Sequence, residues 1–139
     1  VDIDSSQDAN GVIMAQGSRF GGWSLYIEDG YPAYAYNYLG NLHTFRSNKK
    51  ISSGNRKIRF EMDYDGGGAG KGADVRLLVD DKVTSTGRVD ATVGTRFSID
   101  EGADVGMDRG SPVTQRVIGD QRFSAFNGTI NKVTLEIYP

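Results

Sequence analysis

The stretch Arg59-Phe60-Glu61-Met62-Asp63-Tyr64 shows more clearly than any other how this chain folds. Its apolar residues alternate with charged ones, which is the period-2 pattern of a β-strand that buries one face. The same alternation recurs over 23–27 and 75–79. Outward from these three runs, the sequence predicts antiparallel β-sheets that each turn one face toward a core.

Turn residues separate the strand-like runs at short intervals, as at Asp29-Gly30 and Leu39-Gly40. This spacing is typical of an all-β sandwich or barrel, and two sheets packed face to face would bury the apolar faces. We predict an all-β, two-sheet antiparallel sandwich. Its predicted strands are 11–17, 22–28, 33–38, 41–47, 56–65, 73–80, 82–89, 95–100, 103–107 and 126–138, with a surface loop at 108–125.

The last of these runs carries a register signal. Phe126 and Ile130 lie on one phase of the alternation, whereas Val133, Leu135 and Ile137 lie on the other. A slip of one residue turns every following side chain to the opposite face of a sheet. The sequence therefore predicts a β-bulge near residues 131–132.

Length and composition narrow the class of protein. The chain has 139 residues, with 16 Lys and Arg against 18 Asp and Glu, which suits one domain spanning 1–139. A near-neutral charge argues against nucleic acid or an acidic membrane as a main partner. Cysteine is absent, which excludes disulfides and thiol nucleophiles. The single histidine, His43, is interpreted as a packed or surface ring.

Two carboxylates in the run 59–64 suggest the hypothesis that the chain is a glycosidase. Retaining glycosidases need carboxyl groups about 5–5.5 Å apart, and side chains at i and i+2 of a strand lie roughly 6.6–6.8 Å apart on one face. Glu61 and Asp63 have this spacing. The favoured interpretation is a solvent-facing row of charges that pairs with Arg76 on a neighbouring strand.

The glycine-rich stretch 66–72 superficially resembles a phosphate-binding loop. Such a loop needs Gly-Lys-Ser/Thr opening a helix, whereas Lys71 is followed by Gly72 and strands flank both sides. We predict a hairpin loop in which the glycines supply positive φ angles.

An acidic segment surrounds Gly106. Asp104 and Asp108 are four residues apart, and carboxylates gathered at a turn are one way to begin a calcium site. The EF-hand spacing is absent. The favoured alternative is that both carboxylates cap backbone N–H groups in the turn.

Aromatic residues crowd the region between 23 and 38, where Tyr34, Tyr36 and Tyr38 share one strand face and Trp23 lies nearby. Flat rings with a polar tip suit stacking on sugars or a partner surface. Packing between two sheets explains them equally and is favoured, with the alanines between the tyrosines forming a thin opposite face.

The run Gly11-Val12-Ile13-Met14-Ala15-Gln16-Gly17-Ser18-Arg19-Phe20-Gly21-Gly22-Trp23-Ser24-Leu25-Tyr26 resembles the C-terminal region of bacterial arylsulfatases. The resemblance implies a jelly-roll sandwich of the concanavalin and laminin-G kind that follows an α/β sulfatase domain, in a periplasmic or secreted protein. The chain departs from the family at Asp81, where glycine is common, and over 116–123. The resemblance continues, in family order, at 29–30, 34–40, 59–68, 70–72, 79–83, 96–98, 104–113 and 126–130.

The resemblance does not imply activity for this chain. Sulfatases convert a Cys or Ser within Cys/Ser-x-Pro-x-Arg to formylglycine, and this sequence lacks that motif. We therefore expect a non-catalytic accessory domain that needs no cofactor, unless calcium binds at Asp104 and Asp108. Its expected partner is an upstream sulfatase catalytic domain, or a sulfated ester or glycan, with Arg19 facing it because a guanidinium matches sulfate geometry.

Two alternatives remain open at this point. The first is a free-standing carbohydrate-binding module that uses Trp23 and the tyrosines Tyr34, Tyr36 and Tyr38. The second is a jelly-roll glycosidase that uses Glu61 and Asp63.

Overall fold

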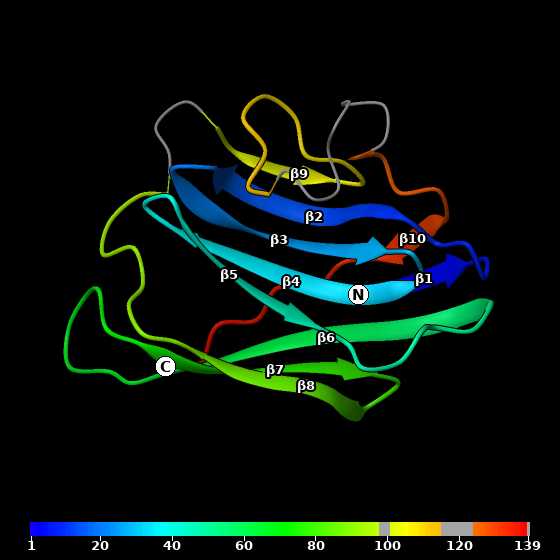
Figure 1. The fold of residues 1–139 in the computed structure, drawn as a ribbon, viewed down its shortest axis with the longest axis horizontal. Helices are drawn as coiled ribbons and strands as arrows, with labels where there is room; N and C mark the ends of the chain where they lie inside the picture. Colours follow the sequence, from blue (N-terminus) through cyan, green and yellow to red (C-terminus); the bar gives the residue numbers. More distant parts are fainter. Residues whose placement is uncertain (98–100, 115–123, 139) are drawn as a thin grey trace.

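Two antiparallel sheets face each other in the computed structural model, which describes residues 1–97, 101–114 and 124–138 (Figure 1). We call them the β6 sheet and the β3 sheet. The β6 sheet has the order β10 (Thr129–Lys132), β1 (Asp2–Ser5), β6 (Gly54–Tyr64), β7 (Ala73–Val79) and β8 (Lys82–Val89). The β3 sheet has the order β5 (Asn41–Arg46), β4 (Tyr31–Tyr38), β3 (Gly21–Glu28), β2 (Gly11–Ser18) and β9 (Ala103–Val105). The predicted all-β, two-sheet antiparallel sandwich is confirmed.

The core lies between the two sheets and follows the alternation of the sequence. Ile58 of β6 and Leu77 of β7 are fully buried there, opposite Leu25 and Ile27 of β3. The charged residues that alternate with them in β6 and β7 point to solvent. This arrangement is the one that period-2 patterning dictates, because successive side chains of a strand point to opposite faces.

The β3 sheet departs from that pattern because its outer face is buried as well. Val12, Tyr26, Ala33 and Ala35 form a second apolar cluster with almost no exposed surface. The segment that follows β9 lies over this face, where Asn37 Nδ2 donates a hydrogen bond of 3.1 Å to the Val113 carbonyl. Small side chains on the outer face let this segment approach closely.

The predicted surface loop at 108–125 is therefore wrong in part. Its described residues contain no regular strand, but Asp108, Val113 and Thr114 are each at most 2% exposed. Both flanks of the segment are tied to β2. Gly106 N, just before it, donates to Ile13 O at 2.8 Å, and Ala125, at its end, forms a bridge with Val12. Residues 115–123 lie outside the described part of the chain.

Several strand bounds also differ from the prediction. β1 was not predicted, because Asp-Ile-Asp-Ser has too few apolar residues to show an alternation. Residues 95–97 form no strand, so that part of the predicted strand 95–100 is wrong, and 98–100 are not described. Of the predicted strand 126–138, only Thr129–Lys132 pairs with another strand.

The predicted bulge is confirmed. Asp2 pairs with Lys132 and Ile3 pairs with Ile130, so Asn131 is the extra residue in β10. The slip in the apolar phase located this irregularity correctly because the core fixes which face each side chain must occupy. No helix long and apolar enough to cross a bilayer occurs in the part of the chain that is described.

Candidate functional site

Two hairpin tips meet at one end of the sandwich, which is the left end in Figure 1. Arg19 and Phe20 connect β2 to β3, and Leu39 and Gly40 connect β4 to β5. The tips are neighbours because β3 pairs with β4, with Gly21 opposite Tyr38. We call this surface the hairpin end and define it by its four exposed side chains, Arg19, Phe20, Leu39 and Leu42.

The hairpin end exposes large apolar side chains. Phe20 is 62% exposed, Leu39 is 65% exposed and Leu42 is 41% exposed. A single exposed leucine is ordinary on a protein surface. Three such residues at adjacent strand ends form a cluster of the kind that a partner surface covers.

Leu39 also has an unfavourable backbone. Its φ is 49° and that of Gly40 is 95°, which are the two positive angles of a type I′ turn. The corresponding first position is aspartate in the other such turns, Asp29 with φ 52° and Asp80 with φ 48°. Aspartate tolerates this region because its side chain bonds the local backbone, whereas leucine does not.

Arg19, the residue that the sequence analysis expected to face a partner, is exposed. Its guanidinium lies 4.9 Å from the centre of the Phe20 ring, and Ser18 Oγ accepts a hydrogen bond from Phe20 N at 3.2 Å. No carboxylate within the described ranges forms an ion pair with it.

The tyrosine strand faces the core. Tyr34 and Tyr36 are 5% and 2% exposed. Tyr34 stacks between Trp23 and Phe60, with ring centres 5.9 Å and 3.4 Å away. Tyr36 Oη accepts a hydrogen bond from Val93 N at 2.9 Å, and burial raises the pKa of both hydroxyls. These two rings pack between the sheets and present no stacking surface.

The other two rings are half-buried at the rim of the same core. Trp23 Nε1 donates a 3.2 Å hydrogen bond to Gln16 Oε1, and Tyr38 packs against the core cluster. His43 lies beside them on β5, directly opposite Tyr36 in the ladder. The structure thus places Trp23, Tyr34, Tyr36 and Tyr38 together, in the packing arrangement that was favoured.

The carboxylates of β6 are engaged in ion pairs. Glu61 lies 2.7 Å from Arg76 and 3.1 Å from Arg59, and Glu61 and Arg76 are direct partners in the ladder. This is the charge row predicted from the sequence. Glu61 thus lies between two guanidinium groups, and each of its carboxylate oxygens is engaged in an ion pair.

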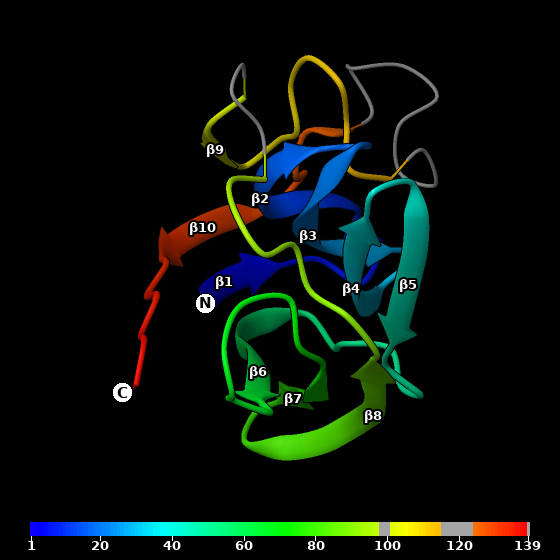
Figure 2. The same cartoon turned by 90° about the vertical axis from the view of Figure 1, so that its left-hand side faces the viewer.

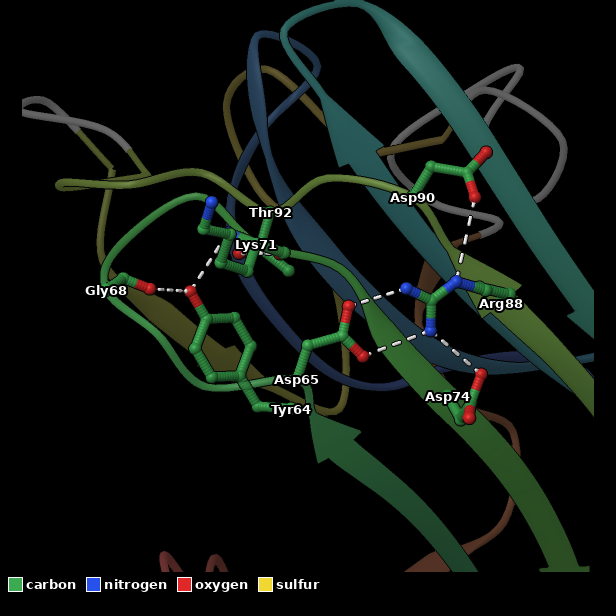
Figure 3. A network of polar contacts seen from close by, with 8 residues as sticks. All are labelled: Tyr64, Asp65, Gly68, Lys71, Asp74, Arg88, Asp90 and Thr92. Carbon is green, nitrogen blue, oxygen red and sulfur yellow. Dashed lines mark hydrogen bonds and ion pairs between the residues drawn. The ribbon is translucent and has the colours of Figure 1, made fainter.

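The stretch 66–72 is a hairpin loop between β6 and β7, as predicted. Figure 3 shows how it is held. Arg88 donates to both carboxylate oxygens of Asp65 and, at 3.0 Å, to Asp74. Tyr64 Oη donates to the Gly68 carbonyl and accepts from Lys71 N. Arg88 lowers the pKa of Asp65 by hydrogen bonding. The sequence did not single out Arg88, which gathers carboxylates from both sides of the loop.

The acidic turn uses its carboxylates on backbone donors. Asp104 accepts from Arg109 N at 3.0 Å, Glu101 accepts from Ser111 N at 2.7 Å, and Asp108 accepts from Val113 N at 2.9 Å. No group of three or more possible metal ligands occurs within the described residues. Burial raises the pKa of Asp108 to about 6, with further contributions from Asp104 and Glu101.

A basic cleft of about 370 Å³ lies where the β5–β6 connection meets the β7–β8 hairpin. It was not recognised in the sequence because its cations come from separate segments. Its lining includes Lys49, Lys50, Arg56 and Lys82, with Asp80 beside Arg56. Three of the four cations have no carboxylate partner among the ion pairs of the described residues.

Comparison with known proteins adds no relative. A scan against protein-family models, a search of curated proteins and a search of solved structures each found no match to this chain.

Proposed function

We propose that this chain is a non-catalytic β-sandwich module that docks onto a larger arylsulfatase-like protein through its hairpin end. The observation that carries the proposal is Leu39, a leucine that is 65% exposed in a left-handed backbone conformation. Strain of this kind persists where it serves a function. Exposed Phe20 and Leu42 beside it extend the apolar surface.

Arg19 gives the proposed docking surface its charge. Its guanidinium has no ion-pair partner among the described residues and lies against the exposed ring of Phe20. An arginine that stacks on an aromatic ring is typical of the buried centre of protein interfaces. The sulfatase link rests on the sequence resemblance alone.

The test is to express the chain together with the coding sequence that precedes it. We expect that sequence to contain Cys/Ser-x-Pro-x-Arg. Hydrogen exchange at residues 19–20 and 39–42 should be slower in the longer protein than in the isolated chain. Phe20→Ser should lower the melting temperature of the longer protein and leave that of the isolated chain unchanged. A preceding sequence without the motif, or hairpins that exchange equally in both proteins, would overturn the proposal.

The basic cleft supports a second candidate function, the binding of a sulfated saccharide. Lys49, Lys50 and Lys82 line it, and cationic side chains attract sulfate groups through charge that salt screens. Binding of a sulfated oligosaccharide at low salt, lost in a Lys50→Gln, Lys82→Gln variant, would support this function. Equal binding by the Lys71→Gln variant and the wild type is the matched control.

A further inference from the structure

Strand β6 is longer than the strand beside it. β6 spans Gly54–Tyr64, whereas β1 spans Asp2–Ser5 and pairs only with the first part of β6. The ladder continues to the first residue, because Val1 N donates to Ile58 O at 2.7 Å and Ile58 N donates to Val1 O at 2.9 Å. Beyond Ile58, no strand of the described chain pairs with β6 on this side.

The orientation of the backbone beyond Ile58 follows from that last pair. Successive residues of a strand direct their N–H and C=O groups to opposite edges. Since Ile58 points toward β1, Phe60, Met62 and Tyr64 point the same way, while Arg59, Glu61 and Asp63 bond to β7. Three residues of β6 therefore direct both backbone groups to an edge that no described strand occupies.

The side chains of these three residues are also only partly covered. They lie on the core face of β6, yet Met62 is 36% exposed and Tyr64 is 42% exposed. By contrast Ile58, where β1 is present, is fully buried. The apolar face of β6 is thus open along the same stretch on which its hydrogen-bonding edge is open.

The C-terminal segment 133–138 borders the other side of this gap. β10 is antiparallel to β1 and β1 is antiparallel to β6, so β10 runs in the direction of β6. The segment 133–138 continues from the end of β10 (Figure 2). Leu135 is 66% exposed and Ile137 is 88% exposed. The segment alternates like a strand but pairs with none.

We propose that β6 at Phe60–Tyr64 and the segment 133–138 form the two walls of a slot for one extended strand of the partner polypeptide. The strand runs antiparallel to both walls, in line with β1, and continues its ladder. This proposal rests on the proposed function in one respect, namely that the larger protein supplies the strand.

The two walls of the slot determine which side chains the bound partner strand must carry. Its backbone would pair with Phe60, Met62 and Tyr64, and the side chains opposite them would face the core, so these must be apolar. The intervening side chains would lie among Arg59, Glu61 and Asp63 on the solvent face and must be polar. About six residues would span the slot, since a strand rises about 3.4 Å per residue.

An open sheet edge with apolar side chains is a feature that proteins normally cover. The stretch Phe60–Tyr64 combines an edge that no described strand occupies with the exposed side chains of Met62 and Tyr64.

The experiment adds a six-residue strand before Val1 as a tethered probe, because tethering raises its effective concentration. Valine occupies the second, fourth and sixth positions before Val1, and threonine occupies the first, third and fifth. We expect amide hydrogen exchange at Phe60 and Met62 to slow at least tenfold. The amides of Arg59 and Glu61 already bond to β7 and serve as an internal control that should not change.

The matched control has the same length and composition except that proline replaces valine at the second and fourth positions. Proline lacks the N–H groups that would bond to the Phe60 and Met62 carbonyls, so the paired ladder cannot form there. It should give no protection. Equal exchange in the valine and proline variants would overturn the proposal. Protection of Phe60 and Met62 in the unextended chain that grows with concentration would also overturn it, by showing that a second copy fills the slot. Either result leaves the hairpin-end test unaffected.

Discussion

The two sheets are built from similar strands but meet different surroundings. In the β3 sheet, the six consecutive residues from Pro32 to Asn37 are buried, so both faces of β4 are covered. Ala33 and Ala35 lie beneath the segment that follows β9. In the β6 sheet, one face lies in the core and the other carries Arg59, Glu61 and Arg76 in water. One sheet is an inner layer and the other is an outer layer.

Because of this difference, a charged side chain or an enlarged side chain affects the free energy of unfolding differently in the two sheets. Asp108, above the β3 sheet, is 2% exposed and burial raises its pKa. Glu61, on the β6 sheet, keeps two arginine partners in solvent. A carboxylate is therefore expected to change the free energy of unfolding strongly when it is buried over the β3 sheet, and only slightly on the exposed face of the β6 sheet.

The largest effect is expected where the two sheets meet. Tyr34→Ala removes a ring that is 5% exposed and stacked between Trp23 and Phe60. Truncating a buried aromatic residue costs about 3–5 kcal/mol of unfolding free energy. Urea denaturation measures it. Phe20→Ala, at a ring 62% exposed, is the matched control and should change stability by less than about 0.5 kcal/mol.

Asp108→Asn tests the buried charge of the inner layer. Because the pKa of Asp108 is raised from 3.8 to about 6, the folded chain keeps a proton between these values that the unfolded chain has lost. Its stabilising contribution is complete below about pH 4 and is lost as the pH rises through about 6. Asparagine keeps an acceptor for Val113 N and carries no charge.

We therefore expect Asp108→Asn to be more stable than wild type by up to about 3 kcal/mol at pH 7.5 and similar to it at pH 4. Urea denaturation at several pH values measures both. A difference that stays constant across this range would show that Asp108 does not titrate between pH 4 and 7.5.

Ala35→Leu tests whether the outer face of the β3 sheet is closed. Ala35 has no exposed surface, so added methyl groups should cost about 1–3 kcal/mol through overpacking. Thr86→Leu makes a similar enlargement on the exposed face of β8 and should stay within about 0.5 kcal/mol. Equal thermal stabilities of the two variants would contradict a covered outer face on the β3 sheet.

Leu39→Asn tests whether the β4–β5 turn is more strained than the β7–β8 turn of the other sheet. The β7–β8 turn has aspartate at both positions with positive φ, 48° and 65°, whereas the β4–β5 turn has a leucine. Asparagine relieves the strain at position 39 and should stabilise the isolated chain by about 1 kcal/mol. A thermal melt measures this. Leu42→Asn, outside the turn, is the control without this gain.

The smallest effect is expected on the open face of the β6 sheet. Glu61→Gln breaks two ion pairs whose side chains are partly in water, and such pairs contribute about 0–1 kcal/mol. The loss should shrink further in 1 M salt because the interaction is screened. A cost above 2 kcal/mol that salt does not reduce would place Glu61 in a buried network instead.

The sequence alone determined the class of fold and much of its register. Alternation at 58–64 and 75–79 predicted which faces of β6 and β7 are buried, and the phase slip after Ile130 predicted the bulge at Asn131. Glycine and aspartate predicted the turns. These features depend on neighbouring residues, because side-chain period and positive φ are local properties of the chain.

Tertiary structure alone decided which surfaces are covered. Ala33 and Ala35 looked like a thin outer face, but the distant segment around Val113 covers them. The residues 133–138 looked like a strand, but no described strand lies beside them, so Leu135 and Ile137 are exposed. Leu39 looked like an ordinary turn residue until its φ was known. Such properties depend on which distant segments meet in space, and local periodicity carries no information about that.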